Sequence, residues 1–121
     1  MPMHTLYGIK NCDSVRKARK FLDAHNIAYE FYDLRANGIS QEQLKSWCKE
    51  VDWQLLLNRR GTTFRQLDPA TKVDIDQNRA IRLMQSQPTL IKRPVLEWHA
   101  TQKQLMVGFT SEQYQDLINW H

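Results

Sequence analysis

The hydrophobic and polar positions change their period several times along the chain, and each change predicts an element. A short run of β-forming residues from His4 to Ile9 predicts a strand. From about Cys12 to Asn26 the apolar residues recur at spacings of three and four, which predicts an amphipathic helix. The aromatic stretch from Ala28 to Leu34 predicts a second strand. A strand, a helix and a strand within about thirty residues form a βαβ unit, so we expect two parallel strands with a right-handed crossover.

The middle of the chain has the pattern of short helices. Ser40 has the chemistry of an N-cap ahead of one helix, and a longer helix is expected over Asp76–Gln87, where Pro88 ends it. Between them, Asn58–Thr63 breaks the helical spacing and is expected to be a loop. The pattern therefore predicts a helical insert over about residues 38–88.

The last third of the chain has the pattern of two strands followed by a helix. Leu90–Trp98 predicts a strand with a proline near its start, and Gln104–Val107 predicts its hairpin partner across a turn near residues 100–103. Thr110 is expected to cap a final helix. The order β-α-β, helical insert, β-β-α is the thioredoxin-like arrangement. We therefore expect one α/β domain over residues 1–121, with a four-stranded mixed sheet whose strand order the pattern leaves open.

Composition supports a globular protein. The 121 residues are 41% hydrophobic and 25% charged, which fits one domain with a real core. No stretch approaches the ~18 apolar residues of a membrane span, and the first residues lack the pattern of a secretory signal. The two cysteines do not make a disulfide framework. We expect a cytoplasmic protein without a membrane partner.

The net charge of +4 comes from basic residues that are dispersed in small groups. Arg16–Lys20 is interrupted by an alanine and is expected to be a solvated helix face. No basic run of five or more occurs, so we do not expect a nucleic-acid partner. Binding of small anions would explain the other basic groups as well as binding of a nucleic acid would.

Cys12 is the candidate nucleophile, because it lies where the first strand has ended and the first helix begins. The first turn of a helix carries unpaired N–H groups and a partial positive charge, which stabilise a thiolate. Lys10 and Arg16 are close in sequence and add to the effect. The neighbours Asn11 and Asp13 are turn and capping residues, which favours a reactive thiol over one that only packs in the core.

The second cysteine and the residues after Cys12 limit the chemistry. Val15 stands three residues after Cys12, which excludes a Cys-x-x-Cys dithiol. Cys48 shares an apolar helix face with Leu44 and Val51, so we interpret it as structural. If the protein is redox-active, the resolving thiol comes from elsewhere, and glutathione is the natural supplier.

Two further features could bind anions. Arg93 precedes Pro94 near the start of the third predicted strand, and its planar donor fork suits carboxylates and oxyanions, although an exposed edge-strand charge explains it equally well. Arg59 and Arg60 lie in a loop with Gly61 and two threonines, which could surround an anion or could simply be solvated. The scattered histidines and the two cysteines predict no metal site.

The chain resembles the arsenate reductase-like family of ArsC, Spx and YffB proteins in four segments: Tyr7–Ser14, Leu57–Thr63, Leu90–Val95 and Val107–Phe109. The resemblance is closest to the YffB group and covers nearly the whole chain. It implies a thioredoxin-like fold, in which a cis-proline at the third strand faces the catalytic cysteine. It also implies a glutathione-dependent thiol reductase with Cys12 as nucleophile, and glutaredoxin is a further partner to be considered. The residues expected to bind substrate or glutathione are Lys10, Asn11, Arg59, Arg60, Arg93 and Pro94.

Departures from the family pattern leave two alternatives. Arsenate reductases of this family carry Asn-Pro where this chain has Ile9-Lys10, and they use three arginines around the oxyanion. Only Arg93 matches, because Asn58 and Val107 occupy the other two places. Arsenate reduction is therefore an alternative in which we expect weak activity. A non-enzymatic, Spx-like regulator that binds RNA polymerase is the other, although the Cys-x-x-Cys often found in Spx is absent.

Overall fold

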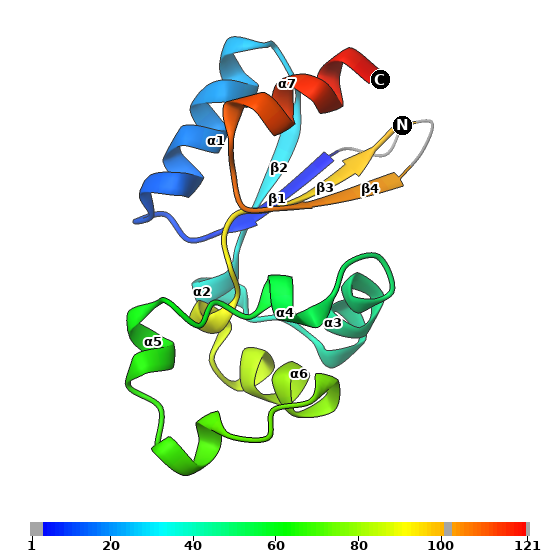
Figure 1. Ribbon diagram of the computed structural model, residues 1–121. Coiled ribbons are helices and arrows are strands. Elements are labelled where there is room, and N and C mark those ends of the chain that lie inside the picture. Colours follow the sequence, from blue (N-terminus) through cyan, green and yellow to red (C-terminus); the bar gives the residue numbers. More distant parts are fainter. Residues whose placement is uncertain (1–3, 101–102, 121) are drawn as a thin grey trace. The chain divides into compact units, whose positions relative to one another are not determined.

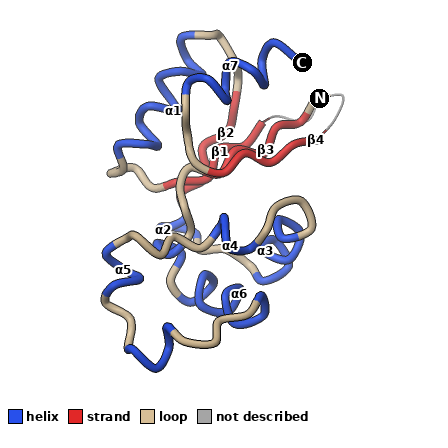
Figure 2. Tube along the Cα trace, viewed as in Figure 1, coloured by secondary structure: helices blue, strands red, loops and turns tan. Residues whose placement is uncertain are grey.

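The structure, a computed structural model, describes residues 4–100 and 103–120, without the side chain of Trp120. The chain divides into two compact units. One unit joins Met1–Asp33 to Arg93–His121, and the other is Leu34–Lys92. The first unit holds every strand of the described sheet, whereas the second is built from short helices (Figures 1 and 2).

The sheet of the first unit has four strands in the order β2-β1-β3-β4. Its strands are β1 (His4–Gly8), β2 (Tyr29–Asp33), β3 (Val95–His99) and β4 (Lys103–Val107). β1 pairs with β2 in parallel, and the other two pairs are antiparallel. The mixed sheet and the parallel βαβ unit predicted from the sequence are confirmed, and the expected turn near residues 100–103 lies partly outside the described residues.

The strand register decides which loops share one end of the sheet. Tyr7 lies opposite Val95, so β3 begins beside the place where β1 ends. Val107, the last residue of β4, also pairs with Val95. The chain that leaves β1 and the chain that enters β3 therefore lie at the same end of the sheet.

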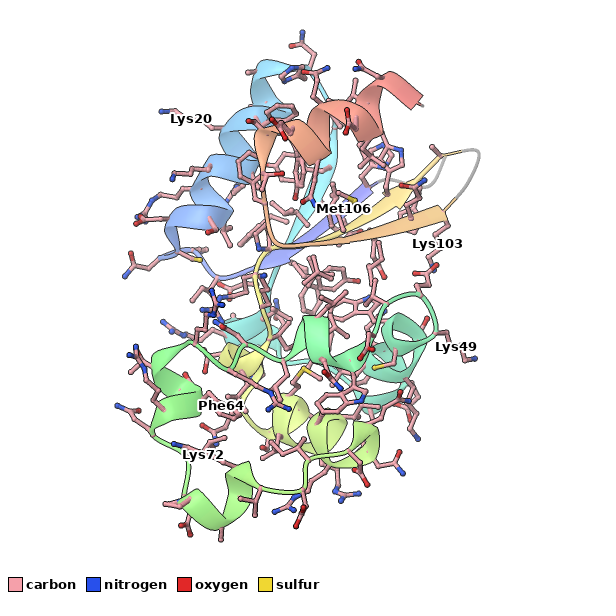
Figure 3. The ribbon with its side chains drawn as sticks, viewed as in Figure 1. Lys20, Lys49, Phe64, Lys72, Lys103 and Met106 are labelled. Carbon is pink, nitrogen blue, oxygen red and sulfur yellow. The ribbon has the colours of Figure 1, made fainter. Side chains whose placement is uncertain are left out.

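Two helices cover one face of this sheet, as Figure 1 shows: α1 (Asp13–Ala24) and α7 (Ser111–Trp120). Successive strand residues point to opposite faces, so Leu6 of β1 and Leu96 of β3 face these helices. Met106, on β4, packs against the same cluster (Figure 3). The buried members of this core are Leu6, Ala18, Leu22, Leu96, Trp98, Tyr114 and Leu117. The amphipathic spacing of the sequence thus becomes the contact between the helices and the sheet.

The predicted helix caps are present. The backbone N–H of Gln43 donates to Ser40 Oγ at 3.1 Å, and that of Gln113 donates to Thr110 Oγ1 at 3.2 Å. Each cap satisfies an N–H that the first helical turn leaves without an intrahelical partner.

The second unit begins at Leu34 and ends at Lys92, whereas the sequence pattern suggests a helical insert over about residues 38–88. The difference arises partly because Leu34 is buried and begins a helix directly after β2. The single-domain organisation stays a prediction. The helices of this unit are α2 (Leu34–Asn37), α3 (Gln41–Cys48), α4 (Trp53–Leu56), α5 (Thr62–Arg65), η1 (Pro69–Lys72), α6 (Gln77–Ser86) and η2 (Pro88–Leu90).

The strand expected from Leu90 begins only at Val95. The backbone before it is paired elsewhere: Asn58 N–H donates to Leu90 O at 2.8 Å, and Lys92 N–H donates to Leu56 O at 2.7 Å. These bonds hold the segment within the second unit, where Ile91 forms an isolated bridge with Leu57. A strand cannot use the same backbone groups twice, so the sheet pairing starts later than hydrophobicity suggests.

The loop expected over residues 58–63 is also shorter than predicted, because Thr62 and Thr63 open α5. Gly61 is the N-cap of this helix. A single helical turn gives too little periodicity to be recognised in the sequence, which explains the difference.

Candidate functional site

Cys12 is the N-cap residue of α1, as the sequence predicts. Its backbone is extended, with φ −143° and ψ 125°, and its carbonyl accepts the first helical hydrogen bond from Arg16 N–H at 2.9 Å. Its side chain is half-buried and makes no capping hydrogen bond. The sulfur thus lies at the positive end of the α1 dipole, which favours negative charge there.

The close approach of Gly8 to Val15 holds the start of α1 against the end of β1. A Cβ atom on Gly8 would lie 2.7 Å from Val15 Cγ2 and 3.0 Å from Cγ1. Val15 is fully buried, so its methyl groups have little room to move. The absence of a side chain at Gly8 therefore sets how near the Cys12 turn lies to the sheet.

The turn around Cys12 is organised by Arg16. Its guanidinium forms an ion pair with Asp13 and donates from Nη1 to Asn11 Oδ1 at 3.3 Å. All three side chains are exposed, so the pair contributes little to stability. Its effect is to join the residue before Cys12 to the first turn of α1. Lys10, also predicted as a site residue, is exposed in the same turn.

The peptide bond between Arg93 and Pro94 is cis, as expected for a thioredoxin-like site. Pro94 is buried, and its carbonyl accepts a hydrogen bond from Gly108 N–H at 2.8 Å. This bond joins the residue directly before β3 to the residue directly after β4. Arg93 is half-buried. Because Pro94 directly precedes β3, the register brings this dipeptide to the sheet end from which the chain runs on to Cys12.

The arginine-containing loop lies in the second unit, where its shape is set by Asn58. The Asn58 side chain accepts a hydrogen bond from Arg60 N–H at 3.2 Å. A Cβ atom on Gly61 would lie 2.9 Å from Asn58 Nδ2, so a larger residue there would require the Asn58 side chain to move. Arg59 is exposed, with its guanidinium carbon 5.8 Å from the centre of the Trp53 ring. Arg60 is also exposed, and the role of both arginines as anion ligands stays a prediction.

Sequence reasoning missed a buried polar pair in the sheet. Tyr7 and Glu97 are each only 7% exposed, and Tyr7 Oη donates to Glu97 Oε1 at 2.8 Å. Burial, and then the hydrogen bond to this carboxylate, raise the pKa of Tyr7. His99 Nε2 lies 3.8 Å from the same carboxylate oxygen. The available signal was a glutamate inside an otherwise apolar strand, since a buried carboxylate requires a partner.

No group of three or more His, Cys, Asp or Glu side chains in residues 4–100 and 103–120 is arranged to bind a metal ion. Within the same ranges, no helix has the length and apolar character needed to cross a membrane.

The comparisons with known proteins show the family and the fold of the chain. The model of the ArsC family matches residues 7–117. Among solved structures, a YffB protein is 51% identical, with a TM-score of 0.88 over 94% of this chain and 97% of its own. An arsenate reductase (ArsC) related protein from Brucella melitensis is 44% identical, with a TM-score of 0.74 over 97% and 95% of the two chains. The global transcriptional regulator Spx of Listeria innocua is 29% identical over 92% of this chain and 83% of its own. The fold is thioredoxin-like, as the order of elements predicts.

Proposed function

The chain belongs to the ArsC family, and on that premise we propose that it is a glutathione-dependent thiol oxidoreductase with Cys12 as its single nucleophile. The observation that supports this most directly is the position of Cys12, half-buried at the N-terminus of a twelve-residue helix. The cis Arg93–Pro94 peptide lies at the same end of the sheet and adds a cation there.

The reaction consists of two thiol–disulfide exchanges. The Cys12 thiolate attacks one sulfur of a disulfide, a new S–S bond forms, and the other sulfur leaves as a thiolate that takes a proton. A glutathione thiolate then attacks the substrate sulfur of this mixed disulfide. Cys12 leaves as a thiolate, and the substrate sulfur is now joined to glutathione in a new disulfide. Val15 cannot act as a resolving residue. Cys48 is a poor one, because burial and then the nearby Asp52 carboxylate raise the pKa of its thiol.

In this proposal, the Arg93 guanidinium binds the carboxylates of glutathione. A guanidinium offers a planar pair of donors that match a carboxylate, and a charge-assisted hydrogen bond is stronger than a neutral one. Lys10 is exposed in the Cys12 turn and supplies a second cation, while Asn11 is held in that turn by Arg16. Pro94 shapes the backbone beside them. Arg59 and Arg60 are further carboxylate ligands in this proposal.

Mass spectrometry after incubation with oxidised glutathione tests the nucleophile. We expect one glutathionyl group on Cys12, lost in Cys12→Ser and retained in the matched variant Cys48→Ser. A second assay follows reduction of a small disulfide by glutathione. Arg93→Ala should weaken glutathione use, and Arg93→Lys should restore only part of it because the charge returns without the fork. Arg82→Ala, an exposed arginine on α6, is the control. Modification of Cys48 instead of Cys12 would overturn the proposal.

The same assay, run with arsenate in place of the disulfide, separates the thiol oxidoreductase from the arsenate reductase alternative. Val107 offers no side-chain donor, and Asn58 offers only an amide in place of the guanidinium that arsenate reductases of the family use. A missing preorganised donor costs about 10²–10³ in rate, so we expect weak turnover of arsenate. Arsenate turnover that exceeds disulfide turnover would favour the arsenate reductase alternative. Co-purification with RNA polymerase, without any disulfide turnover, would favour the Spx-like regulator.

A further inference from the structure

The solvent-facing side of α1 contains a charged hollow of about 580 Å³. It starts at Asp13, the residue directly after Cys12, and runs to Asp23 near the end of the helix. Ten residues of α-helix separate these two positions, which corresponds to about 15 Å. We refer to it as the α1 groove. The residues that line it are Asp13, Arg16, Lys17, Arg19, Lys20 and Asp23.

Two of the four cations in the α1 groove already have structural partners. Arg16 is paired with Asp13. Arg19 donates from Nε to Tyr29 Oη at 3.1 Å, and its guanidinium carbon lies 4.3 Å from the centre of the Phe31 ring. These contacts fix two arginines along the sides of the groove.

Lys17 and Lys20 are the cations left for a ligand. Both side chains are exposed, and neither forms an ion pair or hydrogen bond with any residue in the described ranges 4–100 and 103–120. Figure 3 shows Lys20 extending away from α1. Residues three apart on a helix are neighbours, with Cβ atoms about 5–6 Å apart. The two ammonium groups can therefore contact two carboxylates of one short segment.

The sign of the charge along the α1 groove favours a short acidic protein segment over a nucleic acid. Asp13 lies at one end, where its carboxylate is paired with Arg16, and Asp23 lies at the other end, where its carboxylate repels anions. A nucleic-acid strand places a phosphate at every nucleotide and would bring several past these carboxylates. A protein segment with a few acidic residues can place them between the two aspartates and leave both ends uncharged.

We propose that the α1 groove binds acidic residues that flank the reacting sulfur of a disulfide-bearing protein partner. The inference rests on the proposed function for the reaction at Cys12, and it adds the class of partner. The groove begins one residue after Cys12, so a segment seated on Lys17 and Lys20 holds its neighbouring sulfur near the nucleophile. Charge attraction of this kind raises the association rate and is weakened by salt.

The test uses two synthetic peptides that each carry one cysteine as a mixed disulfide with thionitrobenzoate. One has glutamates flanking the cysteine, and the other has glutamines at the same positions. Cys12 thiolate attacks the peptide sulfur, the Cys12–peptide disulfide forms, and coloured thionitrobenzoate leaves as a thiolate. Cys48→Ala is the background, so that only Cys12 reacts. We expect the acidic peptide to react at least about tenfold faster at low salt. This advantage should disappear as NaCl rises from about 10 mM to 1 M.

Charge reversal at the groove supplies the matched comparison. In Lys17→Glu/Lys20→Glu the acidic peptide should lose its advantage or react more slowly than the neutral one. Lys45→Glu/Lys49→Glu changes the net charge by the same amount at two exposed positions of the second unit. It should keep most of the preference. Equal loss in both double variants would mean that net charge, and not the α1 groove, directs the peptide.

Three controls separate the possible failures. Hydroxyethyl disulfide, small and neutral, should react equally with all groove variants. If Cys12 reacts with no disulfide at all, the proposed function fails. If Cys12 reacts with hydroxyethyl disulfide but shows no charge preference, the groove inference fails. An acidic peptide with serine for cysteine should bind measurably by fluorescence anisotropy, and single-stranded DNA should not displace it at matched charge. Preferential binding of the DNA would overturn the inference.

Discussion

Tyr7 donates a 2.8 Å hydrogen bond to Glu97 and so joins β1 to β3 through a buried carboxylate. By strand alternation the two side chains lie on the sheet face opposite Leu6 and Leu96. Tyr7→Phe removes the donor and leaves the ring in place. A hydrogen bond to a charged group contributes about 1.5–3 kcal/mol, so the free energy of unfolding should fall by that amount in urea titrations. An unchanged midpoint would show that this bond contributes nothing to stability.

The same pair predicts a decline in stability at alkaline pH. Burial and the hydrogen bond to Glu97 raise the pKa of Tyr7 above its ordinary value of about 10. The unfolded chain therefore releases the Tyr7 proton at a lower pH than the folded protein does. The stabilisation is fully present below pH about 10 and is lost as pH rises toward the raised pKa. Unfolding free energies measured above pH 10 should fall, and the fall should be smaller in Tyr7→Phe.

Tyr114 differs from Tyr7 because its buried hydroxyl makes no hydrogen bond with the described residues. Only 1% of the residue is exposed. A buried hydroxyl without a partner costs about 1–3 kcal/mol. Tyr114→Phe should therefore leave the thermal midpoint unchanged or raise it, because the edge contact with Phe109, at 4.7 Å between ring centres, is kept. A loss of stability as large as that of Tyr7→Phe would contradict this assignment.

Gly8→Ala should destabilise the protein by about 1–3 kcal/mol, the usual cost of an extra methyl group in a packed core. The new Cβ would lie 2.7 Å from Val15 Cγ2. Because Val15 is in the first turn of α1, the substitution should also slow the reaction of Cys12 with a neutral disulfide. Gly8→Ala/Val15→Ala is the matched double variant. It should lose less stability than the sum of the two single variants, and strict additivity would argue against a direct clash.

Cys48 should be alkylated by iodoacetamide at neutral pH more slowly than free glutathione. Burial, and then the Asp52 carboxylate, raise the pKa of its thiol and so reduce the thiolate fraction. Asp52 also caps α4 by accepting from Gln54 N–H at 2.9 Å. Asp52→Asn keeps a capping oxygen but removes the charge, so it should accelerate the alkylation of Cys48 without unfolding the helix. Rapid labelling of Cys48 in the unaltered protein would show that the thiol is more accessible than its surroundings imply.

Much of the fold follows from short-range patterns in the sequence. The strand before Cys12, the helix after it and the caps at Ser40 and Thr110 each depend on residues within a few positions of one another. Alternation, three-four spacing and capping chemistry act at that range, so they are visible without a structure. They also place Cys12 at a helix N-terminus, which is the central feature of the candidate site.

Only the tertiary structure decided the relationships between distant segments. The strand order puts β3 beside β1 and so brings Arg93 to the sheet end near Cys12. The backbone around Ile91 pairs with residues 56–58, although its hydrophobicity equally suits the sheet. Glu97 finds its partner ninety positions away, in Tyr7. The choice among such pairings depends on which buried polar groups are satisfied together once the chain is compact, and no local pattern contains that information.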